Sequence, residues 1–127
     1  MHHLTRRQLL KAGVATAVLA RSARAAASPV YLVRTTDREE GIRRGLAVLG
    51  LPSPRGRRVI IKPNFNSADE FPASTHPDTI GALVRQFQAA GASEITVADR
   101  SGMGNTRRVM EQKGVFAQAK QMGYRAV

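Results

Sequence analysis

The sequence predicts an α/β fold in which a parallel sheet and flanking helices form three layers. Short runs of apolar and β-branched residues begin near positions 30, 58, 94 and 124. Intervals of about 30 residues fit one strand–helix–strand crossover each. The segments between these runs carry apolar residues at helical spacing. This alternation is typical of a parallel sheet covered by helices.

The first crossover unit spans the residues from the first apolar run to the second. Residues 30–33 (Val-Tyr-Leu-Val) form the first predicted strand, after Pro29. Apolar residues then recur at helical spacing and predict a helix over 38–49, which Thr36 and Asp37 can cap and Gly50 ends. The β-branched run at 59–61 predicts a buried second strand.

The second unit contains the longest loop of the chain. Residues 62–76 are polar and predict that loop, and Pro77 suits the first turn of the following helix. Gly91 is a suitable residue just beyond the end of that helix. Residues 94–98 predict the third strand, and residues 99–105 form a glycine-rich loop.

The last part of the chain predicts one or two helical segments and a strand. The helical pattern runs from about residue 106 to residue 122 and is interrupted near Gly114. Residues 124–127 look like the start of a fourth strand. Because the sequence stops there, with a sheet edge left open, we expect an incomplete domain.

The N-terminus resembles a twin-arginine export signal. Arg6 and Arg7 precede a short, alanine-rich apolar run, and small residues suited to cleavage follow. The apolar run is too short to span a membrane stably. We therefore expect residues 1–27 to be a signal peptide and residues 28–127 to be the exported domain. The expected partner is the twin-arginine translocation machinery, and the expected location is the periplasm. A basic amphipathic helix on a membrane or nucleic acid is the alternative.

Charge and cysteine content exclude several functions. Five of the 20 lysines and arginines lie in residues 1–27, so residues 28–127 carry 15 basic and 9 acidic residues and a net charge of +6. The aromatic residues do not lie in basic clusters, so we expect no nucleic-acid partner. The chain has no cysteine. This excludes disulfides, and no iron–sulfur cluster can be held through cysteine within the chain.

Candidate site residues follow the second and third strands, where ligands of open parallel sheets bind. Lys62 either points at an anion or extends to solvent. Asn64 either contacts a ligand or forms a turn. His76 either acts in the crevice or caps the helix that starts at Pro77. Asp99 either binds a metal, a lysine or a polar group such as a sugar hydroxyl, or caps the turn that follows the strand. Ser101 lies in the same loop and is a further candidate for ligand binding. No catalytic residue and no metal ligand can be assigned.

Four motifs in this order resemble the domain of unknown function 362 family. They are Ile-Ile-Lys-Pro-Asn at 60–64, Thr-His-Pro at 75–77, Ala-Gly-Ala at 90–92 and Val-Ala-Asp-Arg-Ser-Gly at 97–102. The resemblance runs from about Val30 to the end. It implies a fold and an association with redox proteins, because some members are associated with iron–sulfur segments and some carry export signals. Members are typically much longer, which agrees with an incomplete domain.

We expect an exported protein that binds a small anionic ligand or cofactor. The motivation is a crevice that holds Lys62, Asn64, His76 and Asp99. An association with redox or iron–sulfur chemistry in a longer form follows from the resemblance. The alternatives are a non-enzymatic exported module that binds or matures a partner, and a truncated fragment without function. The cofactor is unknown.

Overall fold

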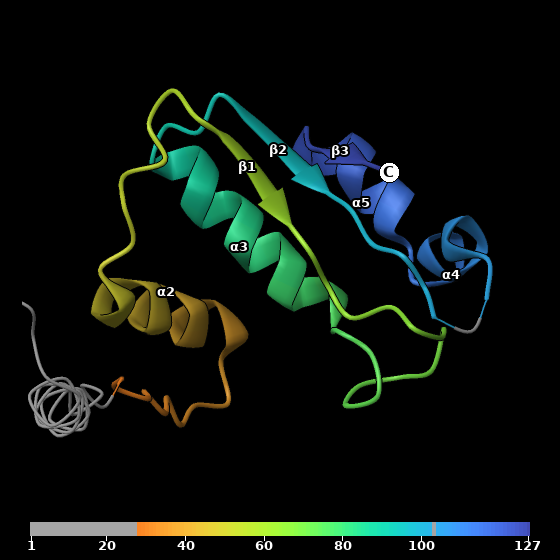
Figure 1. Ribbon diagram of the computed structural model, residues 1–127, viewed down its shortest axis with the longest axis horizontal. Helices are drawn as coiled ribbons and strands as arrows, with labels where there is room; N and C mark the ends of the chain where they lie inside the picture. The colour runs from red at the N-terminus through yellow and green to blue at the C-terminus, as the bar shows by residue number, and fades with distance from the viewer. Residues whose placement is uncertain (1–27, 103) are drawn as a thin grey trace, which may run out of the picture. The chain divides into compact units, whose positions relative to one another are not determined.

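The computed structural model describes residues 28–102 and 104–127. The predicted export signal, with Arg6 and Arg7, lies outside the described residues. Tyr31–Val127 make one compact unit. Within it, a three-stranded parallel sheet is accompanied by four helices (Figure 1). The prediction of an α/β fold with a parallel sheet is therefore confirmed.

The elements follow one another in the order that the hydrophobic pattern predicts from residue 38 onward. They are α2 (Arg38–Leu49), β1 (Arg58–Ile61), α3 (Pro77–Ala89), β2 (Glu94–Val97), α4 (Thr106–Gln112), α5 (Val115–Met122) and β3 (Arg125–Ala126). The strands lie side by side in the order β1-β2-β3, and both pairs are parallel. In this register Ile60 lies opposite Thr96, and Thr96 lies opposite Arg125.

Capping residues set the helix boundaries. The carboxylate of Asp37 accepts hydrogen bonds from the backbone N–H groups of Glu39 and Glu40, at 2.8 and 3.1 Å, so α2 begins where the sequence predicts. The helix ends at Gly50, whose φ of 59° is in the left-handed region that glycine tolerates best. Pro77 opens α3 as predicted.

The predicted strand at residues 30–33 is wrong. These residues adopt no regular secondary structure. Leu32 is 95% exposed, and Tyr31 is 50% exposed. A short apolar run becomes a strand only when a neighbouring strand pairs with its backbone, and the local pattern does not encode that neighbour. The last predicted strand is present but is only two residues long.

One face of the sheet packs against the helices. Successive side chains of a strand point to opposite faces, so Ile61, Ile95 and Val97 enter the core together. There they meet apolar residues of the helices and of the first loop, including Phe65, Ile80, Val84, Met110 and Val115. The opposite face carries Ile60, which is 73% exposed.

Helix α2 lies against α3 with little burial. None of its residues is buried. An ion pair joins the two helices, in which Arg85 Nε donates to Glu39 Oε1 at 2.8 Å. None of the helices in the described ranges combines the length and apolarity that crossing a membrane requires.

Candidate functional site

The structure brings together two of the predicted site residues, Lys62 and Asp99. Lys62 directly follows β1, and Asp99 comes two residues after β2. Because the strands are parallel neighbours, the loops that follow them leave the sheet at the same end (Figure 1). Lys62 Nζ donates a hydrogen bond to Asp99 Oδ1 at 2.7 Å.

Asp99 is the buried member of this pair. Only 2% of its side chain is exposed. Its second oxygen, Oδ2, accepts a hydrogen bond from the backbone N–H of Phe65 at 2.7 Å. Burial alone would raise the pKa of this carboxyl. The hydrogen bonds from Lys62 and from the backbone N–H groups of Arg100 and Phe65 outweigh burial and lower the pKa below its ordinary value of 3.8.

Lys62 is the exposed member. Its side chain is 71% exposed. An ammonium group has three donors. One binds Asp99, and a second lies 3.4 Å from the carbonyl oxygen of Pro63. The side chain of Lys62 therefore reaches solvent and pairs with the protein's own Asp99, and a contact between Lys62 and a ligand anion stays a prediction.

Asn64, near the start of the first loop, contacts residues near the end of that loop. Its backbone N–H donates to Thr75 Oγ1 at 2.8 Å, and its carbonyl accepts from the backbone N–H of Thr75 at 3.0 Å. The Asn64 amide nitrogen donates to the carbonyl of Ala73 at 3.3 Å. These contacts tie the two ends of the loop together. A contact between Asn64 and a ligand stays a prediction.

His76 lies at the start of α3. Its Nδ1 accepts a hydrogen bond from the backbone N–H of Asp78 at 3.2 Å, so the imidazole caps the helix. The ring also meets Phe71 edge-on, with centroids 6.2 Å apart. The side chain remains 33% exposed. The geometry thus supports the capping interpretation, and a role in the crevice stays a prediction.

Ser101 joins the two loops at the edge of the sheet. Its hydroxyl is buried and donates to the carbonyl of Phe65 at 2.6 Å. Next to it, the backbone N–H of Gly102 donates to Asn66 Oδ1 at 3.3 Å. Together with the contact from Phe65 to Asp99, these bonds hold the first loop against the second. The sequence offers no periodic signal for Phe65. It allows Asn66, like Asn64, to contact a ligand or form a turn, and it does not predict the contact between Asn66 and Gly102.

An open hollow of about 290 Å³ lies beside the Lys62–Asp99 pair. Its lining consists of Ile60, Lys62, Ala98, Asp99 and Arg100. Arg100 was not among the predicted site residues, although it directly follows Asp99. Arg100 is exposed, so a second positive charge lies beside the hollow.

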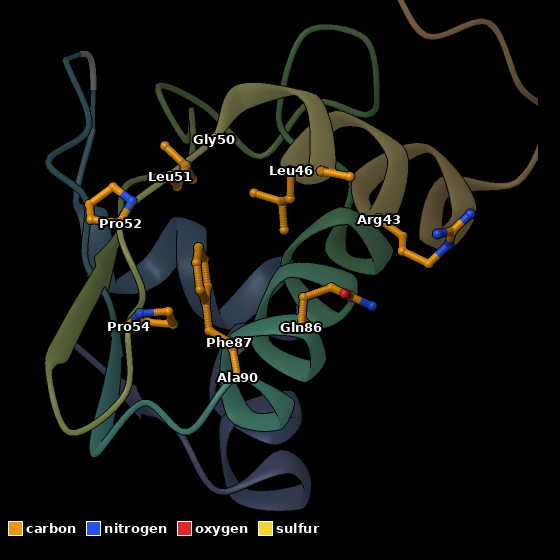
Figure 2. A pocket seen from close by; sticks show the side chains of 10 residues that line it. Arg43, Leu46, Gly50, Leu51, Pro52, Pro54, Gln86, Phe87 and Ala90 are labelled. Atoms are coloured by element: carbon orange, nitrogen blue, oxygen red, sulfur yellow. The ribbon is translucent and has the colours of Figure 1, made fainter.

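A separate hollow of about 430 Å³ lies between α2, the loop after it and α3. Leu46 from α2 and Phe87 from α3 line facing walls, whereas the side-chain tips of Arg43 and Gln86 point away from Phe87 (Figure 2). Arg43 is also paired with Glu40 at 2.7 Å. This apolar hollow holds none of the predicted site residues.

In the part of the chain that the structure describes, no group of three or more His, Asp or Glu side chains is placed to hold a metal ion. Fold and loops together define an α/β domain with polar loops at the carboxyl edge of a parallel sheet. The model of the family described as "Domain of unknown function (DUF362)" matches residues 59–127, more than half of the chain. The chain belongs to this family. No curated protein and no solved structure matches the chain.

Proposed function

We propose that the domain binds a small anionic ligand at the carboxyl edge of its sheet, with Lys62 as the main contact. The observation that carries this proposal is the unequal burial of the Lys62–Asp99 pair. The carboxylate is 2% exposed and the lysine side chain is 71% exposed. The carboxylate of Asp99 is thus enclosed by protein, while the side chain of Lys62 is exposed to solvent beside the hollow.

The hydrogen bonds of Asp99 explain why an anion can approach so close to a carboxylate. Lys62 and the backbone N–H of Phe65 each donate to one of its two oxygens. These donors stabilise the charge of Asp99 inside the protein. The ammonium group of Lys62 keeps one donor for a ligand. Arg100 lines the same hollow and supplies a second positive charge.

In this proposal Asp99 is a positioning residue. It fixes the ammonium group of Lys62 at the mouth of the hollow, so less side-chain entropy is lost when a ligand binds. Ser101 fixes the carbonyl of Phe65, whose N–H contacts Asp99. The two loops therefore act as one support for Lys62.

The test is a titration of the full chain with inorganic phosphate, in chloride buffer, by NMR or calorimetry. We expect Lys62→Gln to weaken phosphate binding about fivefold or more, since a charge-assisted hydrogen bond is replaced by a neutral one. Lys120→Gln is the matched control, because Lys120 is an exposed lysine in the last turn of α5. Circular dichroism confirms that both variants fold. Equal affinity in Lys62→Gln and wild type would refute the proposal and favour a partner-binding module.

We also propose that the protein is exported by the twin-arginine route to the periplasm. The order of Arg6 and Arg7, the apolar run and the small residues supports this proposal. Replacement of both arginines by lysine is expected to abolish export, measured as the exported fraction of the protein. Undiminished export would contradict it. An association with redox proteins in the same compartment rests on the family resemblance, and co-purification of an iron–sulfur partner from that compartment tests it.

A further inference from the structure

The hollow beside Lys62 has an apolar side that inorganic anions do not use. Its lining is mostly apolar, with aliphatic surface from Ile60 and Ala98, and the exposed residues Lys62 and Arg100 place positive charge beside it. Ile60 is 73% exposed, although it lies in the middle of β1. Exposure of a large aliphatic side chain at this position of a parallel sheet is unusual, because such sheets generally have both faces covered.

A second hollow of about 440 Å³ continues along the same face of the sheet. It is lined by residues of all three strands, and it shares Ile60 with the hollow beside Lys62. In the sheet register Ile60 lies next to Thr96, and Thr96 lies next to Arg125. The two hollows therefore meet at Ile60. An elongated molecule can lie across this residue with one end at Lys62.

We infer that the ligand of the proposed anion site is amphipathic. Its anionic head group lies at Lys62 and Arg100, and its aryl or alkyl body lies on Ile60 and Ala98 and extends toward Thr96. This inference rests on the proposed function and adds the chemical class of the ligand. Burial of the body removes apolar surface from water both on the ligand and on Ile60, which strengthens binding beyond the electrostatic contribution of the head group.

The charges on this face favour such a ligand over a second copy of the chain. Arg58 and Arg125 line the second hollow, and Lys62 and Arg100 line the first. The carboxylates at the two hollows are Glu94 and Asp99, and Asp99 is already paired with Lys62. Two such faces would repel each other, whereas an anionic ligand complements them.

The test compares three probes on the full chain by NMR titration: phenyl phosphate, inorganic phosphate and benzyl alcohol. We expect phenyl phosphate to bind about tenfold more tightly than inorganic phosphate, because its ring buries apolar surface. Benzyl alcohol, which has a ring and no charge, is expected to bind at least tenfold more weakly than phenyl phosphate. Ile60→Thr keeps the β-branched shape and is expected to remove most of the preference for phenyl phosphate.

Leu32→Ser is the matched control, since Leu32 is an equally apolar and 95% exposed residue outside the sheet. It is expected to leave the preference unchanged. Equal affinity for the two phosphates, or an unchanged preference in Ile60→Thr, would overturn this inference and leave the proposed function intact. If benzyl alcohol binds as tightly as phenyl phosphate, the assigned head-group contact is wrong. If neither phosphate binds, the proposed function itself fails.

Discussion

Lys62 and Asp99 are 37 positions apart in the chain, and Lys62 Nζ lies 2.7 Å from Asp99 Oδ1. The parallel pairing of β1 and β2 produces this proximity, because it brings the ends of both strands to one edge of the sheet. The pair connects fold and proposed function. Asp99 fastens the two loops, and Lys62 presents the resulting fixed charge to solvent.

Asp99→Asn should destabilise the domain by about 2 kcal/mol. The amide cannot accept hydrogen bonds from both Lys62 and the backbone of Phe65, and bonds to charged groups are worth about 1.5–3 kcal/mol each. The loss stays near the lower end of this range, since Lys62 is 71% exposed and water can solvate its charge. Urea unfolding measures the change. A loss below about 0.5 kcal/mol would mean that Asp99 does not fasten the loops.

The difference in unfolding free energy between wild type and Asp99→Asn should depend on pH. The pKa of Asp99 is lowered in the folded protein, so the unfolded chain binds more protons near its ordinary pKa of 3.8. The stabilisation by Asp99 is therefore complete well above pH 3.8 and is lost as the pH falls through the lower pKa of the folded state. Urea unfolding from acid to neutral pH should show a constant gap between wild type and Asp99→Asn near neutrality. That gap should narrow below pH 3.8, and a gap that widens in acid would contradict the assigned direction.

Ser101→Ala should cost about 1–2 kcal/mol of stability. The substitution leaves the carbonyl of the fully buried Phe65 without the hydroxyl that now donates to it at 2.6 Å. Ser93→Ala, at an exposed serine, is the control and should change stability by less than about 0.5 kcal/mol. Chemical denaturation measures the change in unfolding free energy in both variants. If the two serines prove equivalent, Ser101 does not tie the loops together.

His76→Ala should lower stability by about 1 kcal/mol, because α3 loses the acceptor that binds the backbone N–H of Asp78. His76→Asn supplies another capping side chain and should restore most of the loss. Thermal or urea unfolding of the two variants tests the cap. A third outcome bears on function: if His76→Asn keeps its stability and loses phosphate binding, His76 contacts the ligand as well as capping the helix.

The sequence predicts most of the local structure because its signals are local. Asp37 and Gly50 mark the ends of α2, and Pro77 marks the start of α3. The strand predicted at residues 30–33 is absent, since strand formation depends on backbone pairing with another strand elsewhere in the chain. Apolar composition alone did not distinguish this segment from β1.

The positions of Lys62 and Asp99 in the fold were predictable from the sequence, and their contacts were not. Lys62 and Asp99 follow apolar runs, which places both at the carboxyl edge of a parallel sheet. Nothing in the pattern says that they pair with each other, or that Ser101 donates to Phe65. Those contacts depend on how two irregular loops fold together, and irregular loops have no periodicity to interpret.

Two-dimensional NMR of the full chain can map the phosphate site directly. We expect phosphate to shift the amide signals of residue 62, residues 64–66 and residues 98–102. We also expect Lys62→Gln to remove these shifts and Lys120→Gln to retain them. Shifts centred instead on Leu46 and Phe87, or shifts that persist in Lys62→Gln, would show that Lys62 is not the main contact of the anion.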